Sequence, residues 1–262
     1  MAQIVFQPIS VGNGMPVKYI LFLSAMPGFL DARVLTPKAA QALYMRLTTA
    51  TPEVQDEIVN VHNRFRRNVA PPARNMLKMQ WSPEAAYNAR ILAQYCDLAE
   101  SDPMERRLSH TFCGENVHME PFPILWSEVI ETWYNESRHF KYGEWTMDEG
   151  VKTNHYTQLV WASSYLIGCG VASCRKNREP QYIYICHYCH EGNDPDMINM
   201  PYKMGSWCGD CPDQCEDKLC MNPCFYFDEY QDCEKKARIL GCTHPTINLL
   251  CPATCRCTTE IK

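Results

Sequence analysis

Apolar residues recur with helical spacing in the first clearly patterned segment, which begins at Thr51-Pro52. Threonine caps helices and proline is favoured in the first turn, so a helix is expected to start here. The apolar positions, spaced by four, three and four residues, are Val54, Ile58, Val61 and Phe65. This spacing predicts an amphipathic helix with one buried face.

Two further helices are predicted downstream. One begins at Ser82-Pro83 with the same punctuation. It runs through Ala86, Ile91, Leu92 and Tyr95. The other spans about residues 124–140 and places Val129, Trp133 and Glu136 on one stripe, because seven residues return a helix to nearly the same direction. A carboxylate is therefore expected on an apolar helix face.

Two short runs rich in β-branched and aromatic residues, 166–172 and 181–188, predict a pair of strands separated by a polar stretch. Helices that precede strands within about 150 residues are typical of a layered α+β domain rather than of alternating βαβ units. Residues 33–50 are polar and weakly patterned, and we interpret them as a leader.

The N-terminal region carries Lys18 followed by an apolar run over residues 19–30, which is too short to span a bilayer. This pattern predicts a secretory signal peptide cleaved near Ala32, with residues 1–14 as an extension upstream of Met15. A buried helix is the alternative. Since no later stretch is long and apolar enough for a membrane helix, we expect a secreted, extracellular protein with no transmembrane segment in the mature chain.

The charge pattern argues against a nucleic-acid partner. The chain has 262 residues and a formal net charge of -5, and its Lys and Arg residues are scattered rather than gathered on one face. Its length allows one sizeable domain and a smaller module.

Sixteen cysteines lie after Tyr95, and ten of them fall between Cys208 and Cys257. That density is typical of a disulfide-bonded module made in an oxidising compartment. The spacing of Cys186-x2-Cys189 and Cys208-x2-Cys211 also fits a zinc ribbon, which remains an alternative. Fewer than about 60 residues follow a boundary near Gly205, too few for a comfortable core, and each bridge would add about 2 to 4 kcal/mol.

Several stretches together resemble the cysteine-rich secretory proteins of the CAP superfamily. They are residues 112–116 (FCGEN), 132–136 (TWYNE), 155–161 (HYTQLVW) and 184–193 (YICHYCHEGN). The resemblance covers about residues 50–262. Residues 75–79 and 189–194 are most similar to the mammalian epididymal, sperm-associated type.

The resemblance implies a three-layer α-β-α sandwich over residues 51–204, a disulfide hinge over 205–222 and a small helical, toxin-like, ion-channel-regulator module over 223–262. It also implies eight disulfides, which spacing alone does not choose. The implied pairs are Cys96–Cys174, Cys113–Cys189, Cys169–Cys186, Cys208–Cys215, Cys211–Cys220, Cys224–Cys257, Cys233–Cys251 and Cys242–Cys255.

The family's cleft holds two histidines and two glutamates, and the histidines bind zinc in several members. Glu115, Glu136 and His155 match three of these positions, but the fourth, a histidine, falls on Glu100. One imidazole with up to three carboxylates is a harder ligand set, which favours calcium, magnesium or manganese and weakens zinc binding. His110 or His118 is an alternative ligand, although neither matches the motif position. We therefore expect no required cofactor and at most a weakly bound divalent ion, zinc or calcium. Glu115 is interpreted as a cleft carboxylate that ties loops together and touches such an ion.

Catalysis is not expected. The sequence contains neither a Gly-x-Ser-x-Gly elbow nor a His-Glu-x-x-His motif, and the disulfides account for every cysteine. A Ser-His-Glu arrangement around His155 remains an alternative, because triads are recognised by geometry rather than by order. Asn135, in the sequon Asn135-Glu136-Ser137, is a predicted glycosylation site.

Four aromatic residues cluster at the start of the terminal module: Phe225, Tyr226, Phe227 and Tyr230. A module of this size cannot bury them all, so some are expected to be exposed as contact anchors, although packing on the disulfide core is the alternative. The resemblance implies a binding protein of epididymal fluid and the sperm surface that modulates a membrane ion channel, such as a calcium channel, and engages the egg surface at fertilisation. A sterol or lipid carrier with a groove between CAP helices, or a hydrolase using the cleft, would be the other functions.

Overall fold

The structure, a computed structural model, describes residues 36–262 apart from 110, 146–149, 177–178, 191 and 231. The predicted signal peptide and its upstream extension, residues 1–32, lie outside the described residues. In the part of the chain that is described, no helix has the length and apolar character needed to cross a membrane.

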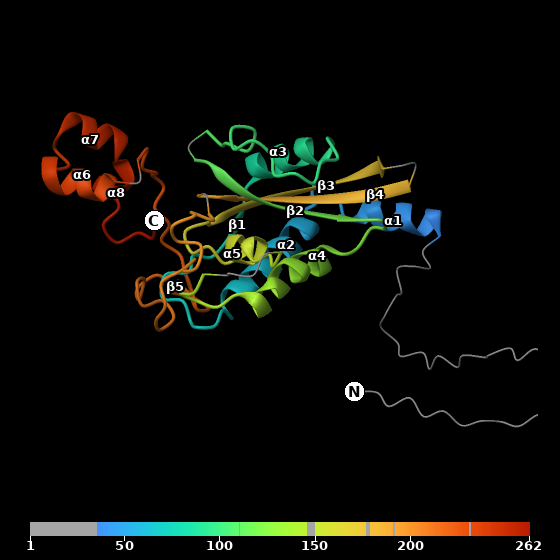
Figure 1. Ribbon diagram of the computed structural model, residues 1–262, viewed down its shortest axis with the longest axis horizontal. Helices are drawn as coiled ribbons and strands as arrows, with labels where there is room; N and C mark the ends of the chain where they lie inside the picture. Colours follow the sequence, from blue (N-terminus) through green and yellow to red (C-terminus); the bar gives the residue numbers. More distant parts are fainter. Residues whose placement is uncertain (1–35, 110, 146–149, 177–178, 191, 231) are drawn as a thin grey trace, which may run out of the picture. The chain divides into compact units, whose positions relative to one another are not determined.

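A four-stranded sheet with the strand order β1-β3-β4-β2 forms the centre of the fold (Figure 1). The strands are β1 Gln80–Trp81, β2 Cys113–Glu120, β3 Leu166–Lys176 and β4 Glu179–Cys189. Strands β3 and β4 are antiparallel, as are β2 and β4, whereas β1 runs parallel to β3. The two predicted strands are thus confirmed, and each is longer than the sequence pattern indicated.

Helices cover both faces of this sheet (Figure 1). The aromatic residues Tyr182, Tyr184 and Tyr188 of β4 belong to the core shared with helices α2 Pro52–Arg66 and α4 Trp126–Tyr134. The intervening Ile183 and Ile185 pack with helix α3 Pro83–Ala93 on the other face. Because strand side chains alternate between faces, β4 supplies both cores, and the predicted three-layer α-β-α sandwich is confirmed.

Helix α2 begins after Thr51 and buries Val54, Ile58 and Val61 as predicted. Phe65 is half-buried and stacks on Tyr134 with ring centroids 4.1 Å apart. The pattern of apolar residues did not reveal that the same helix also buries three polar side chains. They are His62, Asn63 and Arg66.

The buried guanidinium of Arg66 donates hydrogen bonds to backbone carbonyls. The acceptors, at 2.7 to 3.1 Å, are the carbonyl oxygens of Leu77, Leu159, Trp161 and Ala162. Burial lowers the pKa of Arg66 to about 9, so the group remains charged at neutral pH. One side chain therefore fastens two separate backbone segments, at residue 77 and at residues 159–162, to helix α2.

His62 lies in the same buried layer. Its Nδ1 is 2.8 Å from the Ile58 carbonyl oxygen, and its Nε2 is 2.9 Å from the Tyr188 hydroxyl. Burial lowers the pKa of His62 to about 3. The Tyr188 hydroxyl also accepts from Asn116 Nδ2, which connects this network to strand β2.

Helix α3 starts as predicted, with Ser82 Oγ accepting a hydrogen bond from the Ala85 N–H. It ends at Ala93, so the prediction that Tyr95 belongs to this helix was wrong, and that side chain is exposed. The helix packs very close to β3 at Gly168, which has no side chain. A Cβ atom at this position would lie only 2.1 Å from the Ala86 nitrogen.

The third predicted helix is shorter than residues 124–140. Helix α4 ends at Tyr134, and a 3-10 helix, η2 Asn135–His139, follows. Asn135 is exposed and lies at the junction of the two, as the C-cap of α4 and the first residue of η2. Its glycosylation stays a prediction.

Part of the predicted leader is helical, which corrects the interpretation of residues 33–50. Helix α1 Pro37–Arg46 is capped by Thr36 and packs Tyr44 against Tyr182, with ring centroids 5.5 Å apart. Just beyond it, the Leu47 carbonyl accepts a hydrogen bond of 2.9 Å from Trp126 Nε1. Tertiary contacts hold this segment despite its weak apolar pattern.

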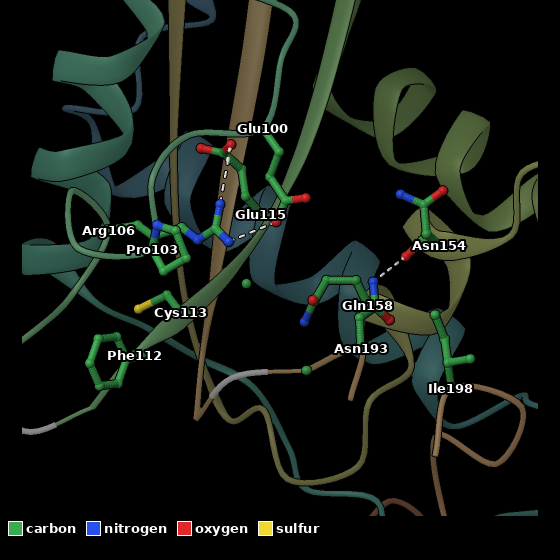
Figure 2. Close-up of a pocket in the computed structure, with 12 residues that line it drawn as sticks. Glu100, Pro103, Arg106, Phe112, Cys113, Glu115, Asn154, Gln158, Asn193 and Ile198 are labelled. Carbon is green, nitrogen blue, oxygen red and sulfur yellow. Dashed lines mark hydrogen bonds and ion pairs between the residues drawn. The ribbon is translucent and has the colours of Figure 1, made fainter. Parts of the chain in front are cut away.

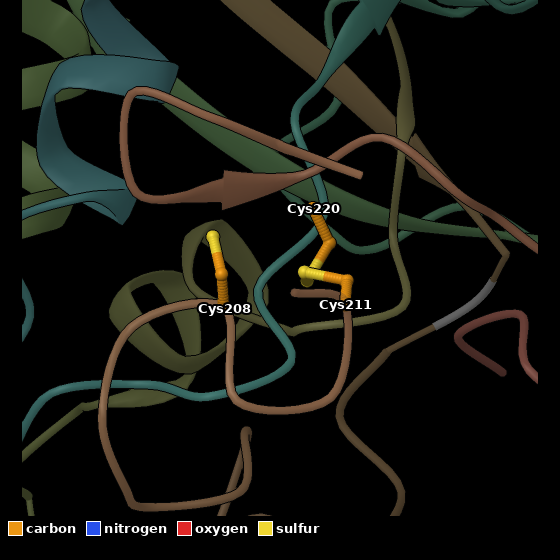
Figure 3. A group of neighbouring side chains, drawn as sticks. All are labelled: Cys208, Cys211 and Cys220. Carbon is orange, nitrogen blue, oxygen red and sulfur yellow. A yellow bond between two sulfur atoms is a disulfide. The ribbon is translucent and has the colours of Figure 1, made fainter. Parts of the chain in front are cut away.

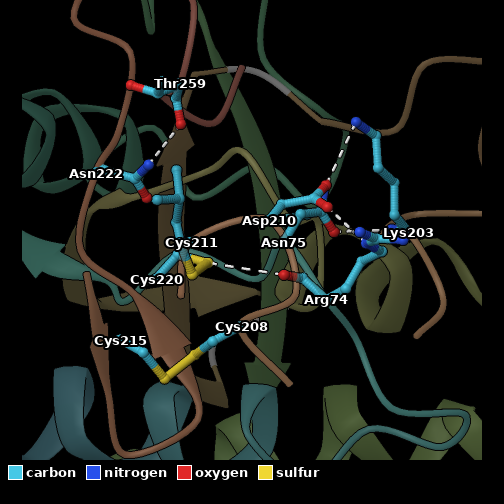
Figure 4. The surroundings of a disulfide bond; sticks show 12 residues. Arg74, Asn75, Lys203, Cys208, Asp210, Cys211, Cys215, Cys220, Asn222 and Thr259 are labelled. Carbon is cyan, nitrogen blue, oxygen red and sulfur yellow. Dashed lines mark hydrogen bonds and ion pairs between the residues drawn. A yellow bond between two sulfur atoms is a disulfide. The ribbon is translucent and has the colours of Figure 1, made fainter. Parts of the chain in front are cut away.

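The segment that the resemblance identifies as a hinge is docked along residues 72–78 (Figure 4). Its short hairpin consists of β5 Cys215–Glu216 and β6 Leu219–Cys220. The Cys220 N–H donates to the Met76 carbonyl at 2.7 Å, and the Lys78 N–H donates to the Cys220 carbonyl at 2.9 Å. An ion pair of 2.5 Å between Arg74 and Asp210 adds to these bonds.

Three short helices follow: α6 Cys233–Leu240, α7 Pro245–Leu250 and α8 Pro252–Arg256. Their interior consists largely of cystine sulfur, together with Ile247 and Ala253. The structure joins the sixteen cysteines in the same eight pairs that the resemblance implies. They are Cys96–Cys174, Cys113–Cys189, Cys169–Cys186, Cys208–Cys215, Cys211–Cys220, Cys224–Cys257, Cys233–Cys251 and Cys242–Cys255.

The contact between α3 and β3 predicts the effect of adding one methyl group. Gly168→Ala should lower the free energy of unfolding by about 3 kcal/mol or more, because backbone and not a flexible side chain occupies the space. Guanidinium unfolding of the oxidised protein measures this change. Ser173→Ala, at an exposed position of the same strand, is the control and should change the value by less than about 0.5 kcal/mol. Equal effects of the two variants would contradict the packing argument.

Candidate functional site

A cavity of about 540 Å³ lies where β2, helix α5 Asn154–Leu159 and the loop before β2 meet (Figure 2). Polar and charged side chains dominate its lining. The lining residues are Glu100, Pro103, Arg106, Phe112, Cys113, Gly114, Glu115, Asn154, Gln158, Gly192, Asn193 and Ile198. The resemblance places four residues in one cleft, and the structure describes all four. The lining of this cavity includes Glu100 and Glu115 but not Glu136 or His155.

Glu115 lies on β2 directly opposite His187 of β4, and both side chains are fully buried. The Glu115 carboxylate accepts hydrogen bonds from His187 Nε2 at 2.9 Å, from the Ser101 N–H at 2.8 Å and from Ser101 Oγ at 3.0 Å. Arg106 Nη1 is 3.8 Å from the same carboxylate. The side chain therefore ties the loop at Ser101 to the sheet.

The surroundings of Glu115 favour its charged form. Burial by itself would raise the pKa of this carboxyl, but the hydrogen bond and charge of His187, the Ser101 N–H and the charge of Arg106 together lower the pKa below its usual range. Glu115 is thus a carboxylate at neutral pH, which does not suit it to be a general acid.

Glu100 takes part in a different interaction. Its carboxylate pairs with Arg106 Nη2 at 2.7 Å (Figure 2). Arg106 Nη1 donates to the Ser101 carbonyl at 2.7 Å. Arg106 is almost fully buried, whereas Glu100 is exposed. The guanidinium therefore holds Glu100 at the rim of the cavity and supports the loop that Glu115 binds.

Glu136 and His155 form a second, separate pair. Glu136 Oε1 is 2.6 Å from His155 Nδ1, and Glu136 Oε2 accepts from the backbone N–H groups of His155 at 3.0 Å and Tyr156 at 3.1 Å. Glu136, the carboxylate that the sequence pattern placed on an apolar helix face, thus caps the start of α5. The His155 ring also stacks against Trp133, with ring centroids 6.4 Å apart.

This arrangement does not fit the predicted divalent-ion site. In the described part of the chain, Cys208, Cys211 and Cys220 form the sole group of three or more His, Cys, Asp or Glu residues whose ligand atoms lie within 4.8 Å of one another (Figure 3). The predicted ligands are Glu100, Glu115, Glu136 and His155. They fall into two pairs whose carboxylates are committed to arginine, histidine and backbone N–H groups, so they do not share one centre.

The zinc-thiolate alternative is also wrong. Cys211 is bonded to Cys220, and Cys208 to Cys215, so these sulfurs are not thiolates (Figures 3 and 4). The other two cysteines of the candidate ribbon are bonded to Cys169 and Cys113. A metal-bound cysteine must be deprotonated, which a disulfide sulfur cannot be.

The floor of the cavity is built around Gln158. A Cβ atom on Gly114 would lie 2.1 Å from Gln158 Oε1, and one on Gly192 would lie 2.1 Å from Gln158 Nε2. The buried amide therefore passes between two glycines. Asn193 Nδ2 donates to the Asn154 carbonyl at 2.8 Å and fixes the neighbouring wall (Figure 2).

The chemistry that this cavity offers is hydrogen bonding and charge recognition. None of its described lining residues carries a hydroxyl group, and its sulfur atom belongs to Cys113, which is bonded to Cys189. The alternative Ser-His-Glu arrangement would need a serine at the other ring nitrogen of His155, because Nδ1 faces Glu136. The lining thus suits the binding of a polar ligand better than nucleophilic attack.

Sequence reasoning missed three residues that organise the site: Ser101, Arg106 and His187. Pairing residue 115 with residue 187 requires the β2–β4 register, and the sequence did not reveal that residues 113–120 form a strand. Alternation of buried and exposed positions is weak in this strand, because polar side chains occupy positions such as Glu115 and Asn116 on both of its faces.

The aromatic residues of the terminal module have unequal environments. Phe225 is exposed and meets Tyr165 edge-on, Tyr226 lies beneath Arg256, and Phe227 is partly buried. Tyr230 is exposed beneath Lys236. Tyr226, Phe227 and Tyr230 line a cavity of about 370 Å³.

The buried environment of Glu115 predicts a pH-dependent contribution to stability. Glu115→Gln should lower the free energy of unfolding by about 3 kcal/mol at pH 7, because His187 and Arg106 lose their carboxylate. The folded-state pKa of Glu115 is depressed, so its contribution is present above the unfolded pKa of about 4.3 and is lost as the pH falls through the folded value.

The difference in the free energy of unfolding between the wild type and Glu115→Gln is therefore expected to become smaller in acid. Guanidinium unfolding at a series of pH values measures this difference. Glu131→Gln, which changes an exposed carboxylate of α4, serves as the control. A difference that stays constant down to pH 2 would argue against a charged Glu115.

Comparison with known proteins places this chain in a family. The description "Cysteine-rich secretory protein family" (CAP) matches residues 59–188, and "Crisp" matches residues 208–262. Cysteine-rich secretory protein 1 of Macaca mulatta is 55% identical over 249 residues, which cover 95% of this chain and 100% of that protein. Cysteine-rich secretory protein 3 of Homo sapiens is 42% identical over 94% of this chain and 98% of that protein.

Among solved structures, the crystal structure of Na-ASP-1 matches with a TM-score of 0.55 and 26% identity, over 66% of this chain and 48% of that one. The two family models agree with a CAP sandwich followed by a cysteine-rich module, and the structural neighbour supports the fold of the sandwich. The chain belongs to the cysteine-rich secretory protein family.

Proposed function

We propose that this chain is a secreted, non-enzymatic binding protein whose terminal module contacts a membrane ion channel. The observation that carries the proposal is the exposure of aromatic side chains on a scaffold held rigid by cystine. Phe225 is 69% exposed, and Tyr226 and Tyr230 are also exposed. Rigid aromatic residues lose little conformational entropy on binding, which makes them effective contact anchors.

The disulfides keep these side chains in place. Cys224–Cys257 closes the module directly beside Phe225, and Cys233–Cys251 closes it just after Tyr230. Cations over the rings of Tyr226 and Tyr230 fix their orientation further. A preorganised surface of this kind supports binding without prior rearrangement.

The biological setting of the proposal is fertilisation. We propose that the protein is secreted into epididymal fluid, associates with the sperm surface, modulates a calcium channel there and takes part in contact with the egg surface. Similarity to cysteine-rich secretory proteins 1 and 3 supports this setting. The absence of a hydroxyl or thiol nucleophile from the described lining of the CAP cavity supports a binding role over a catalytic one.

The proposal predicts a dependence of channel modulation on the aromatic residues. The full-length secreted protein, applied outside the cell, should change the calcium current of sperm in whole-cell recordings. Combining Phe225→Ala with Tyr230→Ala should raise the concentration for half-maximal effect about tenfold or more, because interface anchors dominate binding energy.

Tyr87→Ala, which removes an aromatic side chain of comparable exposure from α3, is the matched control and should leave the effect unchanged. A wild-type protein that does not alter the current would refute channel modulation. Equal potency of the wild type and the double variant would refute the assigned contact.

A further inference from the structure

The charges of the terminal module are separated along the chain. Residues 223–234 contain four acidic residues and no Lys or Arg, whereas residues 235–256 contain four basic residues and no Asp or Glu. The basic residues are Lys235, Lys236, Arg238 and Arg256. Although the net charge of the whole module is modest, residues 235–256 form a cationic half of it. This half consists of most of α6 together with α7 and α8.

The cations of this half are accessible from solvent. Lys235 is exposed, and Arg238 pairs with Glu234 at 3.4 Å through two largely exposed side chains. Lys236 pairs with Asp232 at 2.5 Å and is also partly exposed. Exposed pairs of this kind are weak in water, so an external anion competes with them readily.

Large aliphatic side chains protrude from the same half. Ile239 is 71% exposed, Leu240 is 51% exposed and Leu249 is 73% exposed. Cystine sulfur and Ile247 fill the space between the helices, which leaves the other large aliphatic residues on the surface. Lys235 and Ile239 are one turn apart on α6, so a cation and an aliphatic side chain share one side of the helix.

This composition favours a lipid surface over a protein partner. Leucine is under-represented among residues that dominate protein interfaces, whereas tryptophan, tyrosine and arginine are enriched. Exposed aliphatic residues flanked by lysine and arginine are typical of segments that lie in the interface of a membrane with anionic lipids. The compact scaffold presents these groups without any need to fold on binding.

We propose that residues 235–256 bind the surface of a membrane that contains anionic phospholipid. Ile239 and Leu240 enter the headgroup region, while Lys235 and Arg238 contact lipid phosphate. This binding does not depend on the proposed ion channel, so a lipid-only system tests it and a failure there leaves the channel proposal standing.

Cosedimentation of the full-length secreted protein with vesicles provides the test. Binding to vesicles of phosphatidylcholine and phosphatidylserine should be about tenfold or more tighter than binding to phosphatidylcholine alone, and added salt should weaken it. The double variant Ile239→Ser with Leu240→Ser should weaken binding about tenfold. The charge variant Lys235→Gln with Arg238→Gln should remove most of the preference for phosphatidylserine.

The matched control is Leu98→Ser, which removes an aliphatic side chain of 50% exposure from the loop after α3. It should bind as the wild type does, and mass spectrometry should find eight intact disulfides in every variant. Equal binding to both vesicle types, or equal binding by the α6 variants and the wild type, would overturn the proposal. A third outcome would also overturn the proposal: the wild type binds no vesicles, but the α6 variants lose channel modulation. This outcome would assign the surface to a protein partner.

Discussion

Cystine pairing is the constraint on which the rest of this structure depends. Cys169–Cys186 joins β3 to β4, and Cys113–Cys189 joins β2 to β4, so the sheet that positions the cleft is closed covalently. In the terminal module the bridges replace a hydrophobic interior, because so short a chain cannot bury enough apolar surface. A rigid interior of sulfur in turn leaves aromatic, aliphatic and charged side chains outside, where they are available to partners.

In the cleft, two buried or partly buried carboxylates hold segments of the backbone in place. Glu115 holds the loop at Ser101 against the sheet, and Glu136 caps the helix that carries His155. Each glutamate also orients one imidazole: Glu115 contacts His187, which is not among the cleft positions that the family resemblance implies, and Glu136 contacts His155. Their oxygens are occupied by N–H and O–H groups of the protein, which favours a structural role for them and leaves the polar cavity beside Glu115 to act as a binding surface.

Local signals in the sequence predicted the helices and strands that carry their own caps and periodicity, and family resemblance implied the sandwich and the disulfide pairs. Helix α1 escaped prediction because its stability comes from long-range contacts, such as that of Tyr44 with Tyr182, rather than from its own pattern. The partnership of Glu115 with His187 depends on strand register, and the capture of Glu100 by Arg106 depends on loop conformation. Neither is encoded in the spacing of residues, so the family resemblance could name the glutamates and His155, but the partners of Glu100 and Glu115 could not be predicted from the sequence.

Arg66 shows how one buried charge makes distant segments assemble together. Its guanidinium is shared among carbonyls of the chain entering β1 and of the turn after α5, so it gains full solvation by protein dipoles when all of these segments have arrived. A state that buried the guanidinium before all of these carbonyls were in place would leave N–H groups with neither water nor an acceptor, which is costly. A lysine could not substitute, since a single ammonium has three donors and lacks the planar spread needed to reach four carbonyls. The residue thus couples local folding events into one cooperative transition.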